Sequence, residues 1–137
     1  MITRAGVLVD ANVIVDIATN NPRWQPWSAQ ALADAADQAE LWVNPIILAE
    51  VAPSFATAGE LDAFLPATTF RREDLPWEAA FEAGWAYARY RRAGGERRSP
   101  IADFYIGAHA AARGYALLTR DAARFRTYFP GVALITP

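Results

Sequence analysis

The chain has 137 residues, of which 53% are hydrophobic and 20% are charged, so it can bury a substantial core and is not a disordered chain. It contains no cysteine, which excludes disulfides and thiolate metal sites. Its net charge of −2 is unevenly spread, because residues 1–82 hold 4 Arg and 12 acids whereas residues 83–137 hold 9 Arg and 3 acids. No apolar run approaches the roughly 20 residues of a membrane span, and the N-terminus lacks a signal-peptide pattern. We expect a soluble, cytoplasmic protein with no membrane partner.

A strand is expected first, over residues 6–9, because this stretch is short, apolar and β-branched. It runs into Asp10, and a helix is expected to open just after, near residues 12–13. Residues 26–38 carry an Ala-rich helical pattern that follows a proline-marked loop. Residues 40–43 then predict a second strand.

Asn44 and Pro45 are typical of a helix start, with Asn as the N-cap and Pro at the first helical position. Pro53 is expected to end or bend that helix. A further short helix is predicted over 60–65, and a third strand over 68–70.

A long helix is predicted over residues 76–92. Trp77, Phe81, Trp85 and Ala88 recur along it at helical spacing. Such a stripe is typical of a face packed against the core, and we predict that these aromatic side chains are buried.

Ser99 and Pro100 repeat the pattern of a cap followed by proline, so the next helix is expected over 100–113. Strands are predicted over 116–118 and 132–135. Strands alternate with helices throughout, which favours an α/β fold in three layers, with a parallel sheet of about four to five strands between helices. We expect residues 1–137 to form a single domain.

Four acidic residues stand apart from the polar faces and loops that hold most of the others: Asp10, Glu50, Asp103 and Asp121. Asp10 and Asp121 follow predicted strands, and the carboxyl ends of parallel strands line the ligand crevice of an open α/β sheet. If all four converge, repulsion must raise their pKa values or a cation must neutralise them. Carboxylates without nearby Cys or His suit Mg²⁺ or Mn²⁺ and not Zn²⁺.

Each acid also has a purely structural interpretation. Asp10 could cap a helix, Glu50 could be a satisfied half-buried acid, Asp103 could favour a helix N-terminus, and Asp121 could cap the next helix. The helix face that carries Asp103 continues through small residues, which predicts that something approaches it closely.

Four polar residues near these acids have ordinary structural interpretations. Asn12 and Thr119 are typical of turns and caps. The lone His109 is interpreted as a packed residue and not as a ligand, and Asp16 as a solvent-facing acid.

Three stretches of the chain, LVDANVIVD, NPIILAEV and SPIADFYIGAHAAARGYALLTRDAARF, contain the four acids in order. Together they resemble the PIN-domain family, and most closely its VapC-type toxins, over about residues 7–135. The resemblance implies a metal-dependent endoribonuclease that uses Mg²⁺ or Mn²⁺, and a compact PIN-like fold with an acidic pocket at the carboxyl edge of its sheet. It also implies a homodimer that is held inactive by a VapB-type antitoxin.

Carried over onto this sequence, the resemblance makes Asp10, Glu50, Asp103 and Asp121 the catalytic, metal-site acids, with Asn12 and Thr119 as polar supports. We predict direct metal contacts from Asp10 and Asp103. We expect the other two acids to complete the site, through water or with a second ion.

The arginines of the second half would form a basic rim that holds the RNA backbone or an antitoxin. The candidates are Arg91, Arg92, Arg97, Arg98 and Arg120. The alternative is that they only solvate a helix end and a loop. Trp24 and Trp27 are candidates for an exposed patch that contacts a dimer partner or antitoxin, with core packing as the alternative.

Two rival functions remain. Phosphoaspartate enzymes and receiver domains share the strand that ends in Asp, but they need a Lys, and this chain has none. The other rival is a catalytically inactive PIN-like module that binds RNA or protein.

Overall fold

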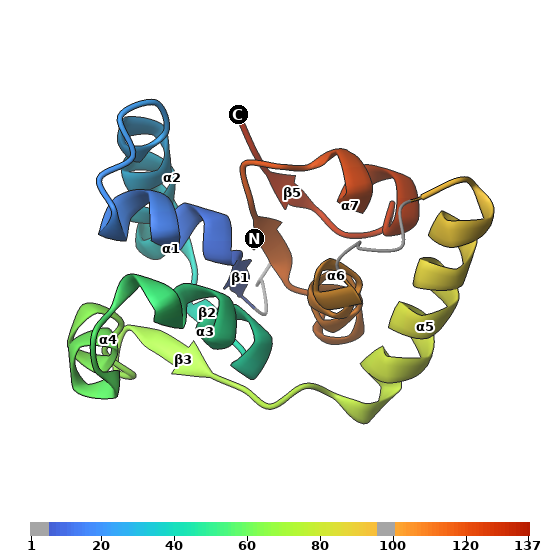
Figure 1. The fold of residues 1–137 in the computed structure, drawn as a ribbon, viewed down its shortest axis with the longest axis horizontal. Coiled ribbons are helices and arrows are strands. Elements are labelled where there is room, and N and C mark those ends of the chain that lie inside the picture. The colour runs from blue at the N-terminus through green and yellow to red at the C-terminus, as the bar shows by residue number, and fades with distance from the viewer. Residues whose placement is uncertain (1–5, 96–100) are drawn as a thin grey trace.

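The computed structural model describes residues 6–95 and 101–137, and its centre is a five-stranded parallel sheet (Figure 1). The strand order is β3-β2-β1-β4-β5, and every neighbouring pair is parallel. The strands are β1 (Val7–Val9), β2 (Leu41–Val43), β3 (Phe70–Arg72), β4 (Ala116–Leu118) and β5 (Leu134–Ile135). The predicted α/β class with a parallel sheet between helices is confirmed.

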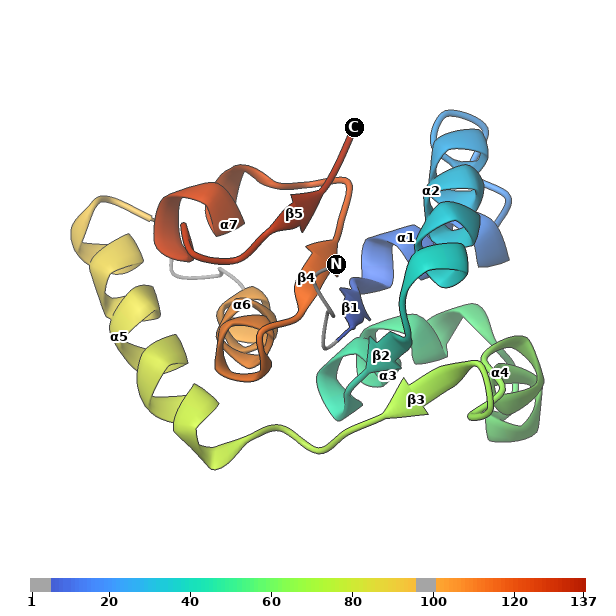
Figure 2. The same cartoon turned by 180° about the vertical axis from the view of Figure 1, so that it is seen from behind.

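The helices form two groups, one on each side of the sheet (Figures 1 and 2). The first group is α1 (Ala11–Ala18), α2 (Gln25–Gln38), α3 (Pro45–Val51), the short 3-10 turn η1 (Ala52–Ser54) and α4 (Ala58–Phe64). The second group is α5 (Trp77–Arg92), α6 (Ile101–Arg113) and α7 (Ala123–Tyr128). Within the described ranges, no helix has both the length and the apolar character needed to cross a membrane.

Strand β1 lies at the centre of the sheet, and its three residues are completely or almost completely buried. Its branched apolar side chains suit a strand that is covered on both faces. The backbone pairing continues to the strand ends: Asp10 N donates to Leu118 O at 2.9 Å, and Thr119 N donates to Ile135 O at 3.1 Å. This pairing fixes Asp10 and Thr119 beside each other at the carboxyl edge.

The predicted element boundaries are confirmed to within one or two residues. Asn44 caps α3 as predicted, since its Oδ1 accepts from Ile47 N at 2.9 Å. Strand β3 begins later than predicted, because Thr69 N and Phe70 N both donate to Pro66 O and close a turn there. The predicted start at Ser99 and Pro100 lies outside the described residues.

The prediction that the aromatic stripe of α5 is buried is wrong. Trp77 is 91% exposed, Phe81 70% and Trp85 50%. The helix instead buries its small residues Ala79 and Ala83 toward α6, with which it makes its main contacts. Helical spacing identified one apolar face correctly, but it could not show which face the neighbouring helix covers.

The close approach predicted at the small-residue face of α6 comes from the chain itself. A Cβ placed on Gly107 would overlap the ring of Phe129, so the glycine makes room for that ring. Trp27 is partly buried against the core, on α2, and Trp24 lies beside it with 6.5 Å between ring centroids. The large exposed aromatic residues therefore lie mainly on α5.

Candidate acidic metal site

Asp10 is both the N-cap of α1 and the most buried of the four predicted acids. It is 5% exposed; its Oδ1 accepts from Ala11 N, and its Oδ2 accepts from Thr119 Oγ1, both at 2.8 Å. Burial raises the pKa of Asp10 from 3.8 to about 7, against the lowering effect of the Thr119 hydrogen bond, and the charges of Asp103 and Glu50 add to the rise. The capping interpretation of Asp10 is confirmed, and its role in a metal site stays a prediction.

The other three acids reach the same edge of the sheet from separate elements. Burial and the charge of Asp103 raise the pKa of Glu50 on α3. Burial raises the pKa of Asp103 in the first turn of α6, and Asp121, just after β4, adds to that rise. The structure thus places Asp103 within electrostatic reach of Asp10, Glu50 and Asp121.

The donor set fits a hard divalent cation in its chemistry. All four groups are carboxylates. Burial and, after it, repulsion between carboxylates raise the pKa values of Asp10, Glu50 and Asp103, and a cation would offset both effects. Within residues 6–95 and 101–137, however, no three acidic or histidine side chains are already close enough to hold a metal ion. A metal would therefore have to draw these carboxylates closer together.

Among the residues that the structure describes, Arg124 is the arginine that pairs directly with one of the four acids. Its Nη1 donates to Asp103 Oδ2 at 2.5 Å, and its guanidinium lies 5.2 Å from the ring centroid of Tyr90. The arginine lowers the pKa of Asp103, although burial outweighs it and the net shift is upward. Arg124 was not among the named candidates, because its pairing with an acid 21 residues away has no local signal in the sequence.

Thr119 and Asn12 hold Asp10 in place. Thr119 Oγ1 donates to Asp10 Oδ2 and accepts from Asn12 Nδ2 and Asp121 N, both at 3.2 Å. Asn12 Oδ1 accepts from Arg120 N at 3.3 Å. These contacts link the end of β1 to the loop that carries Asp121.

The prediction that Asp16 faces solvent is wrong. The residue is 1% exposed, and its carboxylate accepts from Arg120 Nε at 2.7 Å, Arg120 Nη2 at 3.1 Å and Ser28 Oγ at 2.8 Å. Because Arg120 lies next to Asp121, this pair anchors the acid-bearing loop to α1. Its partner is 104 residues away in the sequence, so no local pattern could have revealed the contact.

The predicted rim arginines occupy different environments. The guanidinium of Arg120 is held by Asp16 and lies 5.4 Å from the ring centroid of Trp24. Arg91 and Arg92 are exposed near the end of α5, over the rings of Tyr87 and Trp85. Arg97 and Arg98 lie outside the described residues.

His109 is buried, as predicted for a packed residue. Asn44 Oδ1 already accepts from Ile47 N, so its Nδ2 donates to His109 Nδ1 at 2.9 Å. His109 Nε2 then donates to Glu73 Oε1 at 2.8 Å. The ring thereby ties α6 to the ends of β2 and β3, and it is saturated by protein partners.

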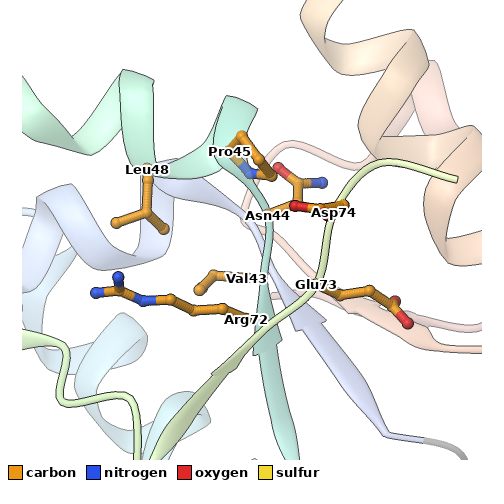
Figure 3. A pocket seen from close by; sticks show the side chains of 7 residues that line it. All are labelled: Val43, Asn44, Pro45, Leu48, Arg72, Glu73 and Asp74. Carbon is orange, nitrogen blue, oxygen red and sulfur yellow. The ribbon is translucent and has the colours of Figure 1, made fainter.

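A cavity of about 290 Å³ opens beyond β2 and β3, but it is separate from the four acids (Figure 3). Its lining is Val43, Asn44, Pro45, Leu48, Arg72, Glu73 and Asp74. Arg72 and Glu73 point to opposite sides of the chain, and they pair with Asp62 and His109 respectively. None of the four acids lines this cavity, so it is not the predicted acidic pocket.

Comparison with known proteins places this geometry in a family context. The model of the PIN domain matches residues 7–129. The fold is similar to VapBC2 from Rickettsia felis bound to a promoter DNA fragment, with TM-score 0.72 and 18% identity over 96% of this chain and 98% of that one. It is also similar to a toxin-antitoxin complex from Klebsiella pneumoniae, with TM-score 0.69 and 19% identity over 96% and 98% of the two chains. A third similar structure is VapBC-1 from nontypeable Haemophilus influenzae, with TM-score 0.72 and 16% identity over 95% and 96%. No curated protein matches the sequence significantly.

Proposed function

This chain belongs to the PIN-domain family, and from that premise we propose that it is a Mg²⁺- or Mn²⁺-dependent endoribonuclease, the toxin of a VapBC-type pair. The observation that carries the proposal is the gathering of carboxylates at one edge of the sheet, where burial and neighbouring carboxylate charges raise the pKa values of Asp10, Glu50 and Asp103. Such an arrangement costs folding energy unless a cation offsets it. The similar toxin-antitoxin structures support a VapB-type antitoxin as partner, and we propose a homodimer that acts in the cytoplasm.

In this proposal the residues of the site have separate roles in binding and orienting the metal ion. Asp10 and Asp103 would hold the ion directly, and Glu50 and Asp121 would complete its shell. When bound, Mg²⁺ or Mn²⁺ supplies a water of lowered pKa and a positive charge beside the phosphate. Thr119 keeps Asp10 oriented by its hydrogen bond. His109, the chain's one histidine, cannot serve as an acid-base group because it is buried and engaged at both nitrogens.

The alternative is a catalytically inactive module that binds RNA or protein. One observation favours it: Arg124 already neutralises Asp103, so the apo site has an internal counter-charge. A binding module would need neither Mg²⁺ nor Mn²⁺. Metal dependence therefore separates the two functions.

The test is cleavage of a mixed pool of structured RNAs by the purified chain with Mn²⁺, with Mg²⁺ and with chelator. We expect cutting only with metal, and none by Asp103→Ala, which removes a proposed ligand. Asp37→Ala is the matched control, because Asp37 is an exposed acid on α2. Cutting that persists in chelator or in Asp103→Ala would contradict the proposal.

Arg124→Ala should change metal binding and cleavage in opposite directions. Loss of the guanidinium frees Asp103 Oδ2, so we expect Mn²⁺ to bind several-fold more tightly in a calorimetric titration. Cleavage should fall by about tenfold or more, because a cation beside the proposed metal site is lost for phosphate binding. The control is Arg126→Ala, an exposed arginine on the same helix. Weaker metal binding in Arg124→Ala would show that the arginine supports the site and does not compete with metal.

A further inference from the structure

The exposed aromatic residues of α5 form one continuous face. Trp77, Phe81 and Trp85 follow one another at four-residue spacing, so they lie on the same side of the helix. The rings of Phe81 and Trp85 are already in contact, with 6.4 Å between centroids. Contiguous exposed apolar surface of this kind marks an interaction site in a folded protein.

Gly84 lies on the same face of α5, because it follows Trp77 by seven residues and Phe81 by three. It is exposed, and a Cβ placed on it would meet nothing within 4 Å. Glycine in an exposed helix interior costs about 1 kcal/mol relative to alanine. Nothing among residues 6–95 and 101–137 requires this glycine, whereas a second backbone crossing the helix here would.

The charges along α5 indicate which helix would pack against this face. The first half of the helix carries the exposed acids Glu78 and Glu82, and the second half carries the exposed arginines Arg89, Arg91 and Arg92. Glu78 already pairs with Arg113 of the same chain at 2.6 Å, so Glu82 is the acid that would meet the arginines of a second copy. Two copies of this helix in antiparallel contact would each place an acidic half against a basic half. A parallel contact would place like charges together.

We propose that the aromatic face of α5 binds the same face of a second copy of this chain, in an antiparallel, two-fold pairing that crosses at Gly84. Such an interface uses one patch twice, and it is self-complementary in charge. Phe81 of one copy then packs near Ala88 of the other, and Trp77 meets the arginine end of the partner helix. Aromatic residues at the centre of an interface contribute most of its binding energy.

This inference rests on the dimer of the proposed function and assigns its interface. Sedimentation equilibrium of the full chain over a wide concentration range should show a dimer. Phe81→Ser should raise the dimer dissociation constant at least about tenfold. Gly84→Gln should raise the melting temperature of dilute, monomeric protein, because helix propensity improves, and yet weaken the dimer.

Phe64→Ser is the matched control, because Phe64 is an exposed aromatic residue on α4 and its loss should leave the dimer intact. A wild-type chain that stays monomeric, or a dimer that Phe81→Ser and Gly84→Gln leave unchanged, would overturn the inference. So would a monomer in which α5 becomes protected only when an antitoxin is added. RNA cleavage is measured on the same samples, so a monomeric nuclease refutes the interface alone, and an inactive α5 dimer refutes the nuclease alone.

Discussion

Asp10→Asn is expected to abolish metal-dependent RNA cleavage and to stabilise the metal-free protein at neutral pH. The carboxyl of Asp10 has its pKa raised to about 7, so its ionised form is disfavoured in the folded state. A shift of this size corresponds to a destabilisation on the order of 4 kcal/mol once the group is ionised. Asparagine avoids that charge but weakens the hydrogen bonds to Thr119 and Asn12, by about 1 kcal/mol each. We expect a net gain of a few kcal/mol and a melting temperature several degrees higher.

The difference in stability between wild type and Asp10→Asn should depend on pH. A raised folded-state pKa means that the contribution of Asp10 to stability is fully present below pH 4 and is lost as the pH rises through about 7. Thermal melts in chelator should therefore show little difference between wild type and Asp10→Asn near pH 4, and a growing advantage for the variant toward pH 8. A variant that is less stable than wild type at pH 8 would show that Asp10 is held as a structural anion.

Asp16→Ala is expected to cause the largest loss of stability among single acidic substitutions. Removing this carboxylate leaves Ser28 Oγ buried without its acceptor and releases the guanidinium of Arg120. Breaking a buried ion pair costs about 3–5 kcal/mol, and the partial exposure of Arg120 lowers this to about 2–3 kcal/mol. Urea unfolding should show this decrease in the free energy of unfolding.

The same variant tests whether Asp16 acts on the acid site through the loop. Because Arg120 precedes Asp121, we also expect weaker cleavage from folded Asp16→Ala at low temperature. Asp34→Ala is the control, since Asp34 is an exposed acid whose Oδ1 accepts an exposed hydrogen bond from Gln30. Equal stability of the two variants would contradict the anchoring role of the Asp16–Arg120 pair.

The sheet and the positions of the four acids were accessible from sequence because local patterns specify them. Val7–Val9 is apolar and branched enough to identify a central strand, and the end of that strand places Asp10 at the carboxyl edge. Asn44 and Pro45 fixed the start of α3, and with it the helix that carries Glu50. In each case the residues that form the sequence pattern are the same residues that form the strand or the helix cap.

The features that the sequence did not reveal depend on contacts between distant segments. Asp16 has the same local environment whether it faces water or Arg120, and only the fold brings the two together. Arg124 and Asp103 likewise meet only because α7 lies beside α6. The aromatic face of α5 was predicted as core because helical spacing is identical for a face that packs within the chain and for one that is left exposed.

These contacts suggest how an acid cluster persists without metal. The hydrogen bonds that Asp10 accepts lower the free-energy cost of burying its carboxylate. The ion pair with Arg124 does the same for Asp103. Each arrangement keeps a carboxylate at the sheet edge at the expense of stability. In the proposed function a divalent cation relieves that repulsion, which links metal binding to folding stability.

The most direct measurement is a calorimetric titration of the purified, metal-free chain with Mn²⁺ near pH 7.5, with Asp103→Ala and Asp37→Ala alongside. Binding by wild type and Asp37→Ala, with loss in Asp103→Ala and a matching rise in the melting temperature of wild type, is the predicted result. Absence of Mn²⁺ and Mg²⁺ binding by the intact chain would contradict the acidic metal site and leave the binding module as the function to pursue.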